Sequence, residues 1–599
     1  MIKYSITTSY IFCRLFLMKR RKNNVFFGIP LKQLIVLILY FVSFGLQSVF
    51  SQQQFPVNYF SSPLDIPLEL AGNFGELRTN HLHSGLDLKT NEMEGFNVYA
   101  IADAYVSRIK VSSTGYGNAL YLTHPNGYVS VYGHLKQFNL KITKYLRKKQ
   151  YQKESFEIDL SLHPNEIRIK KGDTIALSGN SGSSDGPHLH FEIREAKKEI
   201  PINPQLFGFE IKDSIPPVID KILCVNERSK NYNIFNVNNI DNRFFISQKD
   251  TLLFPSEFSL GISCYDKSER SFSKNGIYKL ALYFDSILIQ KLIFNKFSFD
   301  ETRYVNALIN YKLFVETNKK FIQSKLLPGN KLNIFDTIYN NGIINISDDN
   351  THQIKYKTED FAGNFSELNF AVKKDINEIF NTDTNLVDST YFIDCLNSNM
   401  FSSEKIKLFF TQNSLYENIF LKIKSYKSND AQKFFSDIFE IHDANVPINK
   451  SITMLLKNDS IVDSLLSKLL IIRIKNDNKI VSVGGKFKDG FVMTNINNFG
   501  NFAVSIDTIA PVIKALNYSQ KTLDKRQKSL DFKITDELSG IANYRATLNG
   551  KWVLMEFDSK NNRLTYVIDN QLCVGSNQLK ITVEDNKKNS SELNLLINK

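Results

Sequence analysis

Cysteine is scarce in this 599-residue chain, with five residues in all and no two of them in a CxxC spacing. Glycine and proline number 27 and 15, which excludes a collagen-like or proline-rich chain. Four cysteines follow residue 51, and because they are far apart we expect neither a disulfide framework nor a cysteine-based zinc site. We predict four buried free thiols, with a Cys224–Cys264 disulfide as the alternative; the four are Cys224, Cys264, Cys395 and Cys573.

Long apolar runs are absent after the first 50 residues. The run LIVLILYFVSFGL, residues 34–46, is shorter than the ~20 residues that a membrane-spanning helix needs. Basic residues precede it, and Val49 and Ser51 stand at the −3 and −1 positions before Gln52. This order predicts a signal peptide over residues 1–51, with an uncleaved anchor as the alternative and Met18 as a possible start. We expect an exported protein of the periplasm or cell envelope with no stable membrane span after cleavage.

Acidic residues are absent from residues 1–51, which hold seven Lys and Arg. They account for much of the formal net charge of +13, because the remaining chain has 67 basic residues against 61 acidic ones. A net charge of +6 over about 550 residues indicates no particular partner. We therefore predict that the protein does not bind nucleic acid.

Histidine is rare outside one region: seven of the nine lie between residues 81 and 190. The sequence of this region also predicts strands. Residues 118–123 and 128–132 flank a turn ending in Asn126-Gly127, which predicts a hairpin. Residues 141–154 have no Gly or Pro and are strongly basic, which indicates a helix, and the alternation over 156–162 indicates a strand.

Two segments in the second half of the chain repeat. The segment that begins at Asp213, DSIPPVI, resembles DTIAPVI beginning at Asp507, and Glu359-Asp360 with Asn364 resembles Glu584-Asp585 with Asn589. Each unit therefore opens with a proline-containing strand and closes with a matching strand. The last unit has the size of an Ig-like domain. Short alternating runs between the units predict a further β-sandwich over residues 376–505.

Metal-ligand residues occur in two short segments, HSGLD (His83–Asp87) and HLH (His188–His190). In an extended segment, side chains at even spacing share a face, so each segment could present two ligands together. A catalytic zinc needs three protein ligands and one open position, and two histidines with one carboxylate meet that need. A spare histidine could move protons or stabilise an oxyanion. The candidates are His134 and the remaining member of the His188/His190 pair.

These motifs resemble the LytM/lysostaphin-type zinc metallopeptidases, which cut peptide links in peptidoglycan. FGELR before His83, GYGN at residues 115–118, YGHL around His134 and GNSGSSDGPHLHFE at residues 179–192 occur in the order typical of that family. The resemblance implies that His83, Asp87 and His190 bind zinc, and that His134 and His188 flank the reacting water and stabilise the oxyanion. It covers under a quarter of the chain.

The resemblance and the repeats together predict a mainly β, multi-domain protein. An antiparallel β peptidase domain of the LytM type with a small helical insertion precedes Ig-like β-sandwiches. The expected divisions are a signal peptide (1–51), the peptidase domain (52–210, with an insertion at 139–168), an Ig-like sandwich with an insertion (211–375), a β-sandwich module (376–505) and a C-terminal Ig-like domain (506–599).

The function expected from this resemblance is that of a zinc endopeptidase acting on stem peptides or crosslinks of peptidoglycan. The Ig-like modules would position it or bind an envelope protein. One alternative is a catalytically silent docking or regulatory protein for cell-wall hydrolases, which an insertion plugging the groove would favour. A peptidase of protein substrates and a structural surface protein are the others.

Overall fold

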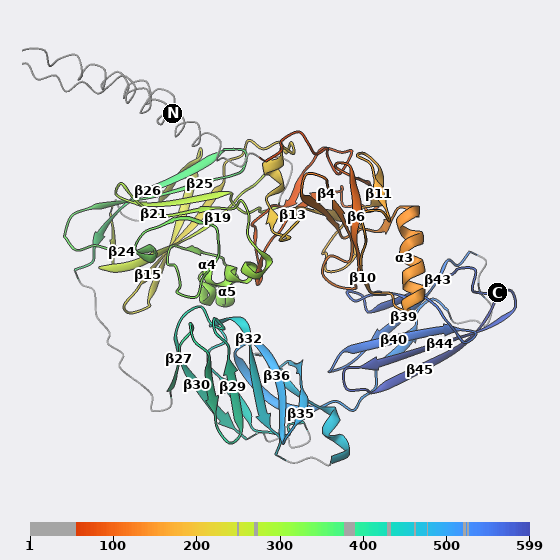
Figure 1. Cartoon of the computed structure of the whole chain (residues 1–599). Coiled ribbons are helices and arrows are strands. Elements are labelled where there is room, and N and C mark those ends of the chain that lie inside the picture. The colour runs from red at the N-terminus through yellow and green to blue at the C-terminus, as the bar shows by residue number, and fades with distance from the viewer. Residues whose placement is uncertain are drawn as a thin grey trace, which may run out of the picture. The chain divides into compact units, whose positions relative to one another are not determined.

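The computed structural model describes residues 55–599 except 248–250, 269–272, 377–389, 428–432, 460–462, 476, 519–522 and 524–525. The predicted signal peptide lies outside the described residues. All the described elements lie in residues 57–599. These are mostly strands (Figure 1), which confirms the prediction of a mainly β protein. No helix among the described residues is long and apolar enough to cross a membrane.

The N-terminal module, residues 57–208, is built on one antiparallel sheet. Its seven main strands run in the order β1 (Leu70–Gly72), β4 (Leu86–Lys89), β13 (His188–Glu195), β8 (Tyr128–Gly133), β7 (Asn118–Thr123), β6 (Ala104–Val111) and β10 (Ile158–Ser161). β14 (Pro201–Ile202) pairs with β13, and β11 (Arg168–Ile169) with β6. A small sheet of β5 (Asn97–Tyr99), β12 (Thr174–Leu177) and β9 (Gln137–Phe138), and the pair β2 (Leu77–Arg78) and β3 (His81–Leu82), complete it, followed by the 3-10 helix η1 (Pro204–Phe207).

Strand β13 divides its side chains between two environments. Leu189, Phe191 and Ile193 are fully buried in the apolar core. Successive side chains of a strand point to opposite faces, so His188, His190 and Glu192 lie together on the other face. That face is where the polar residues of the module gather.

The insertion predicted at residues 139–168 contains the expected helix and strand. Helix α3 (Leu140–Lys153) begins at Asn139, whose side chain accepts a hydrogen bond from the Ile142 amide, and buries Ile142, Leu146 and Gln150. Strand β10 pairs with β6, three strands away from β13 in the sheet (Figure 1). The strand of the insertion is therefore attached to the edge of the sheet that lies away from the metal-ligand motifs.

The first β module, residues 218–374, consists of twelve connected strands. Three short helices, η2 (Phe299–Tyr304), α4 (Val305–Leu308) and α5 (Tyr311–Thr317), interrupt the strands, and η3 spans Asn340–Gly342. The strands are β15 (Val218–Asn226), β16 (Tyr232–Ile240), β17 (Arg243–Ile246), β18 (Thr251–Phe254), β19 (Glu257–Tyr265), β20 (Lys279–Phe284), β21 (Ile287–Ile293), β22 (Ile322–Gln323), β23 (Phe335–Ile338), β24 (Ile343–Asn345), β25 (His352–Glu359) and β26 (Phe365–Lys374).

The second β module, residues 390–506, has two sheets around a shared apolar core. One contains β27 (Thr390–Ile393), β30 (Ile419–Tyr426), β31 (Ile438–Ile441), β37 (Gly500–Ile506), β33 (Leu469–Ile474) and β34 (Ile480–Gly484). The other contains β28 (Asn399–Ser402), β29 (Ile406–Phe410), β32 (Pro447–Lys457), β36 (Phe491–Asn498) and β35 (Lys486–Lys488). The 3-10 helix η4 (Asp463–Lys468) precedes β33.

The C-terminal module, residues 507–598, has two four-stranded sheets around one core. The first runs β38 (Val512–Ala515), β39 (Ser529–Thr535), β43 (Arg563–Val567), β42 (Glu556–Asp558). The second runs β41 (Lys551–Trp552), β40 (Ile541–Leu548), β44 (Ser576–Asp585), β45 (Ser590–Asn598).

The sequence repeat corresponds to the same hydrogen bonds in the first β module and the C-terminal module. Asn364 Nδ2 donates to Asp360 Oδ2 (2.8 Å) and to the Asp213 carbonyl (3.2 Å). Asn589 Nδ2 donates in the same way to Asp585 Oδ2 (2.7 Å) and to the Asp507 carbonyl (3.0 Å). In both modules the repeated Asp–Asn pair therefore ties the closing hairpin to the entering chain.

All four described cysteines are free thiols. Cys224 and Cys395 are buried and Cys264 is partly buried, but Cys573 is exposed. The prediction of four buried thiols is therefore wrong for Cys573, which follows β43 in a connection near the surface.

Candidate metal centre and active site

Two paired strands bring the metal-ligand motifs together. β4 and β13 are antiparallel, with Asp87 directly opposite His190. His83 lies before β4, where the chain bends at Gly85, so the expectation of one extended segment from His83 to Asp87 is wrong. At Gly85 the chain passes so close to the backbone of Phe191 that a Cβ there would clash with the Phe191 carbonyl. This close contact holds His83 against β13.

Three potential ligand atoms converge at the centre of the site. Asp87 Oδ1 lies 2.8 Å from His190 Nδ1 and 3.1 Å from His83 Nε2, and the two nitrogens are 3.1 Å apart. All three side chains are buried. The resemblance implies these three residues as the ligand set, and the structure brings them together.

The hydrogen-bond partners of each imidazole indicate where its proton lies. His83 Nδ1 is 2.8 Å from the carbonyl of Asn73, and His190 Nε2 is 2.8 Å from Glu192 Oε1. Both partners are acceptors, so these two nitrogens carry the protons of the neutral rings. The nitrogens that face Asp87, His83 Nε2 and His190 Nδ1, are then lone-pair donors.

Three acceptor atoms pointing at one another in a buried site require a cation. Although burial opposes it, hydrogen bonds with Asp87 and Glu192 raise the pKa of His190 to about 9. A site that attracts a proton this strongly also attracts a metal ion, and two imidazoles with one carboxylate are a donor set that suits zinc. The residues therefore fit a divalent zinc ion.

Glu192 organises the side chains behind His190. Besides accepting from His190, Oε1 accepts from Ser84 Oγ (2.7 Å) and Tyr116 Oη (2.5 Å), and Oε2 accepts from Arg194 Nε (2.6 Å). Burial acts to raise the pKa of Glu192, but Arg194 and the His190 hydrogen bond hold it below its usual value. A buried carboxylate behind a ligating histidine fixes its tautomer and makes it a stronger ligand.

Arg78 holds the carboxylate of Asp87 from the other side. Its guanidinium binds Asp87 Oδ2 and also Glu76 Oε2 at 3.1 Å. This leaves Asp87 Oδ1 directed at the two histidines. Arg78 therefore fixes the orientation of the Asp87 carboxylate.

The two further histidines lie beside the three converging ligand atoms. The ring of His134 is 4.8 Å from that of His188 and 5.8 Å from that of His190, centre to centre. His134 Nδ1 is 2.8 Å from the Ser181 carbonyl, and His188 Nδ1 is 2.9 Å from the Gly186 carbonyl. These carbonyls place the proton of each neutral ring on Nδ1 and leave a lone pair on Nε2, which in His188 lies 3.3 Å from Asp87 Oδ1. Burial and the nearby His190 and His188 lower the pKa of His134 to about 3.

Two glycine-containing loops hold His134 in place. Gly117 (φ +62°) and Gly182 (φ +70°) pass so close that a Cβ on either would overlap the other loop. The Ser183 amide donates to the Gly115 carbonyl (2.8 Å), which locks the loops together. Their contact fixes the Ser181 carbonyl that receives the His134 proton.

The other histidines of this region lie apart from the ligand atoms. His81 is exposed and His163 lies on the surface of the insertion. His124 is buried between the Asp103 carbonyl (3.0 Å) and Ser130 Oγ (2.8 Å). The structure thus gives His124 a structural position and places His81 at the surface.

Sequence reasoning missed four groups that hold the site. Glu192 could have been found, because it continues the alternation of His188 and His190 on one face of β13. Tyr116, whose ring stacks on His190 at 4.8 Å, gives no such signal. The carbonyls of Asn73 and Ser181 could not have been found, since any residue type supplies a carbonyl.

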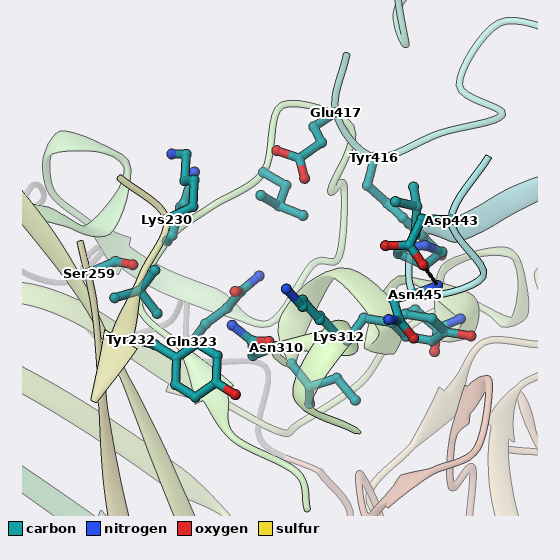
Figure 2. Close-up of a pocket in the computed structure, with 18 of the residues that line it drawn as sticks. Lys230, Tyr232, Ser259, Asn310, Lys312, Gln323, Tyr416, Glu417, Asp443 and Asn445 are labelled. Atoms are coloured by element: carbon teal, nitrogen blue, oxygen red, sulfur yellow. Dashed lines mark hydrogen bonds between the residues drawn. The ribbon is translucent and has the colours of Figure 1, made fainter. Parts of the chain in front are cut away.

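A separate cavity of about 330 Å³ lies between the first and second β modules. Figure 2 shows its lining, which includes Lys230, Lys312, Tyr416 and Asp443. None of the residues that line it within the described part of the chain is a histidine or belongs to the N-terminal module. It is therefore not part of the candidate metal centre.

Comparison with known proteins identifies two of the modules. Residues 81–151 and 159–204 match the model of peptidase family M23, and residues 390–507 match that of the Zu5-like domain. The chain therefore carries an M23 peptidase domain of the LytM type, which confirms the resemblance stated from the motifs. Residues 390–507, which the sequence predicts only as a β-sandwich, match a Zu5-like domain.

Curated relatives match the N-terminal part. The DD-carboxypeptidase/endopeptidase Mpg of Neisseria meningitidis serogroup B is 32% identical over 128 residues, 21% of this chain and 23% of that protein. The cell division protein DipM of Caulobacter vibrioides is 24% identical over 142 residues, 23% of this chain and 19% of that protein. The matched stretch thus spans about a quarter or less of these relatives. A solved zinc-containing peptidase of Vibrio cholerae is 24% identical, with a TM-score of 0.19, over 26% of this chain and 41% of that chain.

Proposed function

We propose that the protein is a zinc-dependent endopeptidase that hydrolyses peptide bonds of peptidoglycan stem peptides or crosslinks. The observation that carries the proposal is the convergence of His83 Nε2, Asp87 Oδ1 and His190 Nδ1 within 3.1 Å of one another in a buried site. His83, Asp87 and His190 are the proposed zinc ligands. Bound zinc supplies Lewis acidity, which polarises a peptide carbonyl and acidifies water.

His134 and His188 are the proposed catalytic residues. Each has its Nδ1 proton engaged by a backbone carbonyl, so Nε2 can accept a proton from the attacking water. Once protonated, the same nitrogen becomes a donor that stabilises the oxyanion or protonates the leaving amine. The low pKa of His134, about 3, keeps its ring neutral before the reaction. Both histidines therefore act as proton acceptors first and as donors afterwards.

The relatives support the substrate class. Mpg is named as a DD-carboxypeptidase/endopeptidase, and enzymes of both kinds cut peptide bonds. We propose peptidoglycan peptides as substrate, export to the periplasm or cell envelope as location, and an envelope protein as partner of the β modules. The docking-protein alternative would be favoured by an insertion that blocks access to the candidate metal centre. Strand β10 of the insertion lies at the opposite edge of the sheet, so this strand does not support that alternative.

Alanine variants test the roles separately. His190→Ala should abolish zinc binding and hydrolysis of purified peptidoglycan. His134→Ala should retain zinc and lose about 10²–10⁴-fold in rate, the usual contribution of a general base. His81→Ala, a change of the same kind at an exposed position, should retain both. Zinc is measured by elemental mass spectrometry. Full hydrolysis by His190→Ala, or equal rates for His134→Ala and His81→Ala, would contradict the assignment.

A further inference from the structure

Three carboxylates converge in the first β module, far from the metal centre in sequence. Asp213 lies in the segment that enters the module, Asp266 follows β19, and Asp360 follows β25. One carboxylate oxygen from each lies within 4.8 Å of the others, and Asp266 and Asp360 are buried. Three carboxylates this close repel one another unless protons or a cation intervene.

Backbone amides donate hydrogen bonds to the carboxylates of Asp213 and Asp360, whereas one oxygen of Asp266 has no partner among the described residues. Asp360 Oδ1 accepts from the Gly363 amide (2.8 Å), and Asp213 Oδ1 accepts from the Ile215 amide (3.0 Å). Asp266 is 5% exposed, and its Oδ1 has no hydrogen-bond partner within the described part of the chain. Burial and the charges of Asp213 and Asp360 raise the pKa of Asp266 to about 8.

Asn275 provides an independent sign that a ligand belongs here. Its amide and carbonyl exchange backbone hydrogen bonds of 3.0 and 2.9 Å with Asp266. In such an antiparallel pair the two side chains extend from the same face of the pair. Asn275 is 3% exposed, and neither its Oδ1 nor its Nδ2 has a partner among the described residues. A buried side-chain amide without partners is costly and therefore uncommon.

We propose that Asp213, Asp266 and Asp360, with the Asn275 side-chain oxygen, bind a calcium ion. All the donors are oxygens, as calcium prefers, and zinc would favour nitrogen or sulfur. Three carboxylates and an amide on four separate chain segments suit the flexible coordination of calcium better than the strict octahedron of magnesium. The ion would neutralise the three charges and complete the coordination of Asp266 and Asn275.

The C-terminal module offers an internal comparison. Asp507, Asp536 and Asp585 form the corresponding cluster, with oxygens also within 4.8 Å. Lys587 stands two residues after Asp585, where the first module has Ala362 two residues after Asp360. Lys587 is 7% exposed; burial lowers its pKa, and Asp507 and Asp585 oppose that effect. Lys587 Nζ donates to the Gly485 carbonyl (2.6 Å) and lies near the charges of Asp507 and Asp585, and the proposal is confined to the first module.

The proposed site would fix the connection between two modules. Asp213 belongs to the segment between η1 of the N-terminal module and β15, whereas Asp266 and Asp360 lie at strand ends of the first β module. A shared ion would tie that connecting segment to the module. Asn275 also precedes Gly276, whose amide donates to Asn73 Oδ1 (2.7 Å) and whose carbonyl accepts from Asn73 Nδ2 (2.6 Å).

The test uses the full chain, saturated with zinc and depleted of calcium, to which calcium chloride alone is added. Isothermal titration calorimetry should show calcium binding, and millimolar calcium should raise the unfolding temperature by several degrees. Asp266→Asn should lose one bound calcium and the thermal shift. Asp241→Asn, at an exposed turn of the same module, should behave as the unchanged chain. Without calcium, Asp266→Asn should be at least as stable as the unchanged chain, because the amide, like the protonated carboxyl of Asp266, adds no third negative charge to the cluster.

A second variant covers the case in which Asp266→Asn does not fold. Ala362→Lys introduces at an exposed position the residue found in the C-terminal module, and should abolish the calcium response without lowering stability in calcium-free buffer. No calcium binding by the unchanged chain at millimolar concentration would overturn the proposal. Calcium binding of unchanged stoichiometry and affinity in Asp266→Asn or Ala362→Lys would also overturn it.

Discussion

Behind the candidate metal centre, the carboxylate of Glu192 is the main acceptor of buried hydrogen bonds. It receives hydrogen bonds from His190, Ser84, Tyr116 and Arg194. At this scale the sequence predicted the five candidate side chains that the structure brings together, because each stands in a short local motif. It could not predict their supports, since the carbonyls of Asn73 and Ser181 depend on the course of the backbone and not on residue type.

Replacing Glu192 by glutamine should weaken zinc binding by about 10–100-fold, the usual effect of losing a carboxylate behind a ligating histidine. The neutral amide is a weaker acceptor for His190 Nε2 and leaves the buried Arg194 with only the more distant Glu199 (3.4 Å) as its countercharge. Zinc affinity is measured by competition with a chromogenic chelator. Glu195→Gln, on the same strand but only partly buried, is the matched control and should bind zinc normally. Equal affinities of the two variants would exclude the proposed role of Glu192.

His124 should make the N-terminal module less stable in acid. Burial lowers the pKa of its imidazole to about 4, below the 6.5 of the unfolded chain. Between pH 6.5 and 4 the unfolded state binds more protons, so the free energy of unfolding falls as the pH falls, by up to about 3 kcal/mol from this group. His124→Gln should flatten this part of the pH profile in urea titrations, whereas His163→Gln, at an exposed position, should not. Identical profiles for both variants would refute the assignment.

Among the elements, the hairpin β7–β8 and helix α3 were predictable from turn residues and composition. The arrangement of His83 was not, because the bend at Gly85 depends on its close approach to Phe191 in β13, 106 residues later in the sequence. The pairing of β4 with β13 is likewise a long-range contact that local periodicity does not encode.

The crossing of the two glycine-containing loops should be sensitive to a single methyl group. Gly182→Ala places a Cβ against Gly117 and should displace the Ser181 carbonyl from His134. Gly172→Ala is the control: it has a similar φ of +84°, but a Cβ there would meet nothing within 4 Å. Both variants should lose about 1–2 kcal/mol of stability to backbone strain. Only Gly182→Ala should also lose most of its hydrolytic rate while retaining zinc, and equal rates would contradict this account of the loops.

In the whole molecule, the repeated units were visible from the sequence because Asp213, Asp360 and their counterparts recur with their neighbours. The sequence did not show that the first β module contacts the metal centre. Asn73, whose carbonyl accepts the His83 proton, exchanges two side-chain hydrogen bonds with Gly276 of that module. Phe74 stacks on Phe297 at 4.6 Å beside it. Contacts with the first β module therefore help to hold the part of the N-terminal module that positions His83.

Truncation should reveal this dependence. A chain ending at residue 375 retains Gly276 and Phe297 and should bind zinc like the full chain. A chain ending at residue 210 loses both, exposes Phe74, and should bind zinc more weakly and unfold at a lower temperature. Zinc titration and thermal unfolding of the two fragments measure the difference. Equal zinc affinity and equal stability would show that the first β module does not support the centre.

The central claim is that the five-residue site hydrolyses peptide bonds of peptidoglycan. It is tested most directly by digesting purified peptidoglycan with residues 52–599 in water enriched in ¹⁸O, followed by mass spectrometry of the released fragments. We predict fragments with one heavy oxygen in a newly formed peptide carboxylate, lost on chelation, restored by zinc and absent with His190→Ala. Zinc-loaded, folded protein that releases no such fragment would contradict the account and favour a docking role.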